Sequence, residues 1–553
     1  MGRAVRSDAE GVYAVLADLD RPCYIVSSGG KPGALCDPPA PGSGATVLAV
    51  AAPQHPGRLG SAEFRRWHGV RHAYMAGSMA GGISGEDLVI ALSRAGYLAS
   101  FGAAGLPEAR VDAALRRLAR ELGDTGRAYA CNLIHSPMDP ALERRCVDAC
   151  LRYGVRCVEA SAFVQLTPDL VRYRVAGLRR APGAPGGVRV ENRLIAKVSR
   201  PETAELFLRP APPELLADLV ARGLADAEQA ELARAVPMAD DITFEADSGG
   251  HTDRRALAVM LPVIVGLRDR VAREHPHRAP VRIGAAGGIG TPESVVAALA
   301  LGASYVVTGS VNQATLEAGT SSAVKRLLAA AGPADCTMAP AADMFEQGVQ
   351  VQVLARGTVF AAHAGRLSRL YRDHAGLAEL PPAELRHLEE RVLRRPVARV
   401  WQDTADYLAR HHPEWLRRAE TDPRYRMAMV FRWYLGMASR WATEGEAERQ
   451  GDWQVWCGPA MGAFNAWTAG SALADPGARG VAAVAGHLLR GAAFHSRVTQ
   501  LRLAGVHLPS ACARYRLPPP GTDAADPAGS TALADPARAT AAGGRPGTAP
   551  AAP

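Results

Sequence analysis

The sequence has 553 residues, of which 48% are hydrophobic, so it is long enough for a large folded core and more than one domain. It shows no uninterrupted apolar run of ~18 residues and no basic segment followed by an apolar one at its start, so we expect no membrane insertion, no secretion and a cytoplasmic location. The formal charge of +8 favours an anionic ligand or an acidic protein partner, although an arginine-rich composition explains it equally well. No interleaving of basic and aromatic residues indicates nucleic acid.

The first 65 residues are predicted to form a small N-terminal subdomain. They include a glycine-rich stretch at residues 27–33 and a proline-rich stretch at residues 38–41, both of which are typical of loops. No pattern in this part of the chain indicates a function.

Eight apolar runs after the N-terminal subdomain end in small or polar residues and lead into helical patterns. The predicted strands are residues 71–76, 97–101, 128–133, 156–160, 193–198, 241–246, 281–285 and 304–308. The amphipathic segments between them include residues 86–94, 107–122, 140–153 and 253–274. Because eight parallel strands close a barrel, the sequence predicts a (β/α)8 TIM barrel over residues 66–334, with a doubly wound open sheet as the alternative. In a barrel, polar residues at the strand carboxyl ends are candidate functional residues.

Two glycine turns follow the last two predicted strands. Gly287 and Gly288 come after the seventh strand, and Gly309 and Ser310 come after the eighth. Glycine lets backbone N–H groups approach an anion closely, and a helix beginning at Thr291 would add its positive N-terminal end. The spacing matches the phosphate site after strands 7 and 8 of a (β/α)8 barrel, so we expect these four residues to bind a cofactor phosphate.

Three segments extend beyond the minimal barrel. Residues 201–237 hold two or three helical patterns where one would suffice, so we expect a helical insertion over the strand carboxyl ends. Residues 335–510 are mainly helical and contain seven of the eight tryptophans, which form either a helical core or a partly exposed partner surface. Residues 517–553 are rich in Ala, Gly and Pro, and we expect a disordered tail.

The nine cysteines contain no CxxC pair. Cys146 and Cys150 are one helical turn apart, whereas Cys131 and Cys157 lie in predicted strands. These positions favour buried reduced thiols over a metal site, so we expect no metal.

Several motifs resemble those of known flavin enzymes. Residues 241–251 end in Gly249, Gly250 and His251, which resembles the Gly-Gly-His turn of nitronate monooxygenases and of flavin-dependent bacterial enoyl-acyl-carrier-protein reductases. Residues 74–84, 101–106, 341–354 and 456–465, the last with Gly-Pro-Ala-Met-Gly, resemble the PfaD family. These are stand-alone enoyl reductases that work in trans with polyunsaturated fatty acid synthases and modular polyketide synthases. The resemblance runs from about residue 12 to 505 and includes the helical region that the shorter nitronate enzymes lack.

The resemblance implies FMN at the barrel mouth. By position it assigns flavin contacts to two turns, made of Gly77, Ser78, Met79, Ala80, Gly249 and Gly250. Asn132 is expected to bond the polar edge of the ring, and Lys197 to place a positive charge near its N1 and O2 side, which would stabilise reduced flavin. The simpler alternatives are a turn former for Asn132 and a solvated strand end for Lys197.

His251 has two interpretations. It could cap a helix that begins at Thr252 and Asp253, or its imidazole could polarise the substrate carbonyl or help to deliver a proton. Ser248 stands where the family commonly has alanine, which leaves this role unproven.

The implied activity is reduction of a 2-enoyl thioester on acyl carrier protein, with FMN as cofactor and NADPH or NADH as reductant. We expect FMN rather than FAD because the chain has no second dinucleotide-binding βαβ unit. Residues 335–510 are expected to shape the substrate mouth and to receive the carrier protein. The alternatives are a flavin oxygenase acting on a nitronate and a noncatalytic docking component of a synthase.

Overall fold

The computed structural model describes residues 4–137, 139–184, 187–275 and 280–527. Eight parallel strands close into a barrel in the order β10-β11-β13-β14-β4-β5-β6-β7. They are β4 (Tyr74–Ala76), β5 (Leu98–Phe101), β6 (Ala130–Ile134), β7 (Cys157–Ser161), β10 (Arg193–Val198), β11 (Asp241–Glu245), β13 (Arg282–Ala286) and β14 (Tyr305–Thr308). The predicted (β/α)8 barrel is confirmed, and the open-sheet alternative is wrong.

Helices cover the outside of the barrel, so its strands are buried on both faces. These helices are α3 (Glu86–Arg94), α4 (Glu108–Leu122), α5 (Pro140–Arg152), α6 (Pro168–Ala176), α7 (Pro201–Leu208), α10 (Leu257–Glu274) and α11 (Pro292–Ala300), whereas the four-residue helix α12 (Ser310–Gln313) follows β14 and contacts the later helix α19 (Pro459–Thr468). The helix α4 illustrates why these helices pack on the barrel. Its apolar residues recur at helical spacing and so form one buried face, made of Val111, Ala114, Leu115, Leu118 and Leu122.

A short helix closes the amino-terminal end of the barrel. This helix, α2 (Ala62–His68), stacks Phe64 on Tyr305 with ring centroids 4.2 Å apart. His68 Nε2 lies 2.8 Å from the buried Asp241 carboxylate, which Arg282 also contacts at 2.6 Å. A domain boundary at residue 65 would therefore cut through an element of the barrel.

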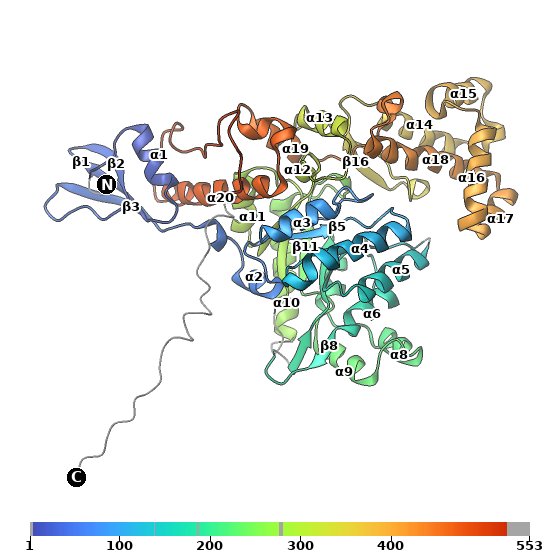
Figure 1. Cartoon of the computed structure of the whole chain (residues 1–553), viewed down its shortest axis with the longest axis horizontal. Coiled ribbons are helices and arrows are strands. Elements are labelled where there is room, and N and C mark those ends of the chain that lie inside the picture. The colour runs from blue at the N-terminus through green and yellow to red at the C-terminus, as the bar shows by residue number, and fades with distance from the viewer. Residues whose placement is uncertain (1–3, 138, 185–186, 276–279, 528–553) are drawn as a thin grey trace, which may run out of the picture.

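The N-terminal part consists of α1 (Ala9–Ala17) and a three-stranded antiparallel sheet of β1 (Cys23–Ser28), β2 (Lys31–Leu35) and β3 (Ala45–Ala51). Its core includes Phe494 and Val498 of the long helix α20 (Val481–Leu503). Arg497, also on α20, is fully buried and donates to backbone carbonyls of this part, including that of Leu16 at 3.1 Å. The two ends of the chain thus share one core, and α20 lies between the sheet and the barrel (Figure 1).

The extra segments after β7 lie on the flank of the barrel. The helices α8 (Pro213–Ala221) and α9 (Ala227–Ala235) pack against α6, and α9 also contacts the hairpin of β8 (Leu178–Arg180) and β9 (Val188–Val190). The insertion over the strand carboxyl ends is therefore not observed, because α8 and α9 pack beside the barrel and α7 serves as the barrel helix.

Residues 335–510 contain helices and two strands. The strands β15 (Cys336–Pro340) and β16 (Gln350–Leu354) form a sheet with β12 (Gly250–His251), and α13 (Ser322–Ala329) precedes them. The helices α14 (Phe360–Asp373), α15 (Pro382–His387), α16 (Val397–His411), α17 (Pro413–Thr421) and α18 (Pro423–Glu444) form a lobe at the end of the molecule opposite the N-terminal sheet (Figure 1). The helix α19 (Pro459–Thr468) follows. The seven tryptophans of this region all pack in or against the hydrophobic core, which supports the helical-core interpretation.

Residues 517–527, the described start of the expected tail, form no helix or strand but contact the body of the protein. The Ala472 N–H donates to the Pro518 carbonyl at 2.9 Å, and the Tyr97 hydroxyl donates to Asp526 at 3.2 Å. The rest of the expected tail lies outside the described residues. Among the helices that the structure describes, none combines the length and apolar character that a membrane span requires.

Candidate active site

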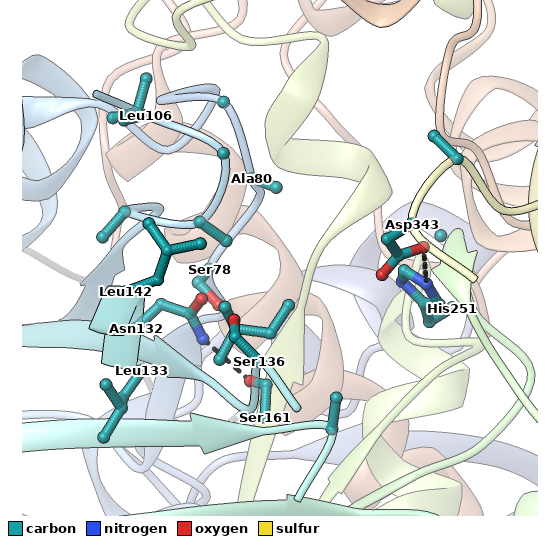
Figure 2. Close-up of a pocket in the computed structure, with 18 of the residues that line it drawn as sticks. Ser78, Ala80, Leu106, Asn132, Leu133, Ser136, Leu142, Ser161, His251 and Asp343 are labelled. Carbon is teal, nitrogen blue, oxygen red and sulfur yellow. Dashed lines mark hydrogen bonds and ion pairs between the residues drawn. The ribbon is translucent and has the colours of Figure 1, made fainter. Parts of the chain in front are cut away.

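A cavity of about 1680 Å³ opens at the carboxyl ends of the barrel strands and extends to the helical lobe. Eight of the thirteen predicted site residues line it: Ser78, Met79, Ala80, Asn132, Lys197, Gly249, Gly250 and His251. The described lining does not include the other five, which are Gly77, Gly287, Gly288, Gly309 and Ser310. Figure 2 shows Ser78, Asn132 and Ser161 on one wall and His251 with Asp343 on the other.

Asn132 is held in one orientation by its neighbours. The residue is 4% exposed, and its Nδ2 donates to the Glu159 carbonyl at 3.1 Å and to Ser161 Oγ at 2.9 Å. Both amide hydrogens are therefore engaged, and Oδ1 remains as an acceptor for a ligand N–H. The residue lies inside β6, so the turn-former alternative is wrong.

Lys197 lines the cavity next to carboxylates. Its Nζ is 3.3 Å from Glu245 Oε1, and its side chain is 19% exposed. Burial favours the neutral amine, but the charges of Glu245 and Glu159 outweigh that effect and raise the pKa of Lys197. The lysine is thus a buried, paired cation rather than a solvated strand end.

His251 sits on the strand β12, where it pairs with Val351 of β16. Its Nε2 lies 3.2 Å from Asp343 Oδ1. Partial desolvation raises the pKa of the Asp343 carboxyl, but the hydrogen bond and charge of His251 together have the larger effect, so this pKa ends below its usual value. An ionised carboxylate only accepts, so Nε2 carries the proton of this bond, and Nδ1 is the nitrogen that can exchange a second proton. The helix α10 begins only at Leu257, so the helix-cap interpretation of His251 is wrong.

The glycine turns leave open space at Gly288 and Gly309. Gly287 and Gly288 have φ values of +82° and +73°, a conformation that favours glycine. A Cβ at Gly287 would lie 2.6 Å from the Ala246 carbonyl carbon, whereas no described atom lies within 4 Å of a Cβ built at Gly288 or Gly309. The open space fits an anion such as a phosphate. The expected start of α11 is confirmed, because the Thr291 hydroxyl caps it by accepting from the Ser294 N–H.

Two further contacts tie these turns to the rest of the site. The Gly77 N–H donates to the Thr308 carbonyl at 2.9 Å, which places the turn after β4 beside the end of β14. The Gly458 N–H, just before α19, donates to Ser310 Oγ at 3.0 Å. Ser310 thus accepts one bond and keeps its own O–H to donate.

The helical lobe forms the outer part of the cavity. Tyr407, Arg410, His411 and His412, at the junction of α16 and α17, line it together with Arg145 and Arg152 of α5.

All nine cysteines are free thiols, and Cys131 and Cys150 are buried in the hydrophobic core, as predicted. With Cys146 they bring three sulfur atoms within 4.8 Å of one another. Their positions in the sequence did not reveal this cluster, because Cys131 comes from β6 and the other two from α5.

Sequence reasoning missed Glu159 and Asp343 as site residues. Glu159 is an acidic residue within a fully buried strand. Because acidic side chains are rarely buried without a partner, its position in a predicted strand could have marked it as a candidate site residue. Asp343 gave no such signal, because its partner His251 lies 92 residues away.

Comparisons with known proteins agree with the barrel fold. The solved enoyl reductase domain of MlnA, from the macrolactin biosynthesis cluster of Bacillus amyloliquefaciens, is 36% identical, with a TM-score of 0.75 over 81% of this chain and 98% of that domain. The chain belongs to the PfaD enoyl reductase family. Residues 374–453, in the lobe, match the family described as the inserted helical domain of [acyl-carrier-protein] S-malonyltransferase.

Two curated relatives of this PfaD-family chain are longer proteins. One belongs to the polyunsaturated fatty acid synthase of Thraustochytrium sp. (strain ATCC 26185 / S-3) and is 47% identical over 509 residues, which are 91% of this chain and 34% of the relative. Polyketide biosynthesis protein PksE of Bacillus subtilis (strain 168) is 45% identical over 416 residues, which are 75% of this chain and 53% of the relative. The chain thus spans between a third and about half of the length of these two relatives.

Proposed function

We propose that this chain is an FMN-dependent enoyl reductase that reduces 2-enoyl thioesters carried on acyl carrier protein, acting in trans in polyketide or polyunsaturated fatty acid biosynthesis. The observation that carries the proposal is one cavity at the barrel mouth that is lined by Asn132, Lys197 and the His251–Asp343 pair. The enoyl reductase domain among its relatives supports the reaction class.

The residues present suit FMN. The open glycine turns would hold the phosphate through backbone N–H groups and the Ser310 hydroxyl. Asn132 Oδ1 would accept from the N–H at the polar edge of the ring, and the segment Ser78–Ala80 would lie along it. Gly249 and Gly250 would adjoin the ring from the β12 side.

When bound, FMN would accept a hydride from NADPH or NADH and pass it to Cβ of the 2-enoyl thioester. The overall reaction consumes one hydride and one proton, which saturate the Cα–Cβ double bond and leave the thioester intact. Negative charge develops on the thioester oxygen as the hydride reaches Cβ. His251 would donate a hydrogen bond to that oxygen or supply the proton to Cα, and Asp343 would hold its ring.

The helical lobe would receive the carrier protein. Its residues Tyr407, Arg410, His411 and His412 line the outer part of the cavity, along which a tethered acyl chain would pass. Residues 374–453 contain thirteen arginines and thirteen acidic residues, so any electrostatic attraction of an acidic carrier would be local to the cavity entrance.

Absorption of the purified protein, followed by turnover assays, tests the proposal. We expect flavin bands and NADPH-dependent conversion of carrier-bound 2-butenoyl thioester to a product two mass units heavier. Flavin with oxygen uptake only on a nitronate would favour the oxygenase alternative. Protein without flavin after reconstitution would favour a docking component.

A further inference from the structure

Three ionisable side chains meet on adjacent barrel strands. Lys197 of β10 pairs in register with Ser161 of β7 and with Thr243 of β11. Glu159 lies two residues before Ser161, and Glu245 lies two residues after Thr243. Because side chains two residues apart share one face of a strand, both carboxylates point into the barrel on the same face as Lys197. Glu245 therefore lies nearer the mouth than the lysine, and Glu159 lies deeper.

Glu159 is the most buried member of this group. Its side chain is fully buried, and Oε2 accepts from the Ser78 N–H at 2.9 Å. Oε1 has no hydrogen-bond partner among the residues that the structure describes, and it lies 3.6 Å from where a Cβ at Gly77 would be. The carboxylate thus lies directly under the turn that the proposed flavin would contact.

The charges of the three groups do not cancel. With both carboxylates and the ammonium ionised, the group carries one excess negative charge, so Lys197 does not present a net positive charge to a ligand above it. This differs from the sequence-based expectation for Lys197, which considered the lysine alone.

We infer that Glu159 is a positioning residue that lowers the reduction potential of the bound flavin, because its carboxylate offsets the charge of Lys197 beneath the ring. The inference rests on the proposed binding of FMN. Reduction adds negative charge to the ring, and a nearby buried negative charge opposes that change. A lower potential makes the flavin a stronger hydride donor to the enoyl thioester and a weaker acceptor from NADPH.

The variant E159Q separates charge from hydrogen bonding. Glutamine keeps an oxygen that can accept from the Ser78 N–H but removes the charge. We expect the equilibrium constant for reduction of its flavin to rise about tenfold. For a two-electron couple this is a shift of the reduction potential by about 30 mV to more positive values. Anaerobic reductive titration against a reference dye measures this shift. Stopped-flow mixing should also show faster reduction by NADPH and slower oxidation by the enoyl thioester.

Three other variants complete the test. E159D keeps the charge and should keep the potential. E86Q changes a buried glutamate on α3 that pairs with Arg110 outside the cavity lining, and it should leave the potential unchanged. K197M removes the positive charge and should shift the potential to more negative values.

A normal potential in E159Q with FMN bound would overturn the inference. If E159Q does not hold FMN, E245Q takes its place, since it removes the other carboxylate beside Lys197 and should shift the potential in the same direction. An unchanged potential in E245Q would then overturn the inference. If the wild-type protein itself binds no FMN, the proposed function fails first, and the inference falls with it.

Discussion

The backbone N–H of Gly458 donates to Ser310 Oγ across 3.0 Å, and this bond joins the helical region to the glycine turns at the barrel mouth. The same region supplies Asp343, which holds His251, and Gln352, whose amide donates to Asp247 at 2.6 Å. The chain after the barrel is therefore part of the site, and the barrel alone does not contain every residue that shapes it.

Replacing Gly288 with leucine should abolish FMN binding. A side chain there would fill the open space of the proposed phosphate site, and the positive φ adds strain of about 1 kcal/mol. Gly154 is a matched control, because its φ is +64° and no described atom lies within 4 Å of its Cβ position. Flavin absorbance after gel filtration should fall in G288L and not in G154L. Normal occupancy in G288L would remove the phosphate assignment.

Replacing His251 with alanine should leave FMN binding and flavin reduction by NADPH intact. Reduction of the enoyl thioester should slow by about 10²–10⁴, the usual range for a positioned acid–base group. D343N should cause a smaller loss, because asparagine can still hydrogen-bond the ring but lacks the charge. Stopped-flow absorbance at the flavin band measures both half-reactions. A wild-type enoyl rate in H251A would assign His251 a structural role.

The carrier-bound substrate should have a lower KM than a short N-acetylcysteamine thioester. This difference in KM should shrink as salt is added, because added salt shortens the Debye length below ~8–10 Å and screens the charges. Arg410 lines the cavity entrance, so R410Q should raise KM for the carrier-bound substrate only. Arg399 lies on the same helix but pairs with Asp403 away from the cavity lining, so R399Q is the control. Equal KM values for the carrier-bound substrate in R410Q and R399Q would contradict the docking proposal.

Acid should destabilise the protein partly through His72. Burial lowers the pKa of His72 from its ordinary 6.5 to about 3, and neither ring nitrogen has a hydrogen-bond partner among the described residues. Below pH 6.5 this histidine is therefore protonated in the unfolded chain but stays neutral in the folded protein. The free energy of unfolding falls by about 1.4 kcal/mol for each pH unit between pH 6.5 and pH 3.

The variant H72F checks this pH dependence. A phenyl ring can keep the stack on Tyr97, whose centroid lies 4.6 Å away. Thermal unfolding of H72F should lose less stability than wild type between pH 6.5 and 4. Parallel curves for the two proteins would show that His72 does not contribute.

The sequence predicted the barrel because its strands and helices have strong local patterns. The helix α3 begins and ends at the predicted residues 86 and 94, since its apolar spacing and the glycine at position 96 are local features. The strand β12 was not predicted, because only two residues form it and their partner strand lies about a hundred residues later. Pairing of this kind depends on the tertiary fold.

The same distinction holds at the site. Asn132 and Lys197 were predicted as site residues because they lie near the ends of predicted strands, and the structure places both in the cavity lining. The charge around Lys197 could not be predicted, since it depends on the register that brings Glu159 and Glu245 to neighbouring strands. The insertion at residues 201–237 was placed wrongly because helical patterns do not show on which side of a barrel they pack.

A single-turnover reaction tests the central claim most directly. The FMN-loaded protein would be photoreduced without oxygen or nicotinamide and then mixed with carrier-bound 2-butenoyl thioester. We predict that the flavin reoxidises and that the carrier gains two mass units in an amount equal to the flavin. Flavin that stays reduced until oxygen is admitted, with the thioester unchanged, would contradict the assignment as an enoyl reductase.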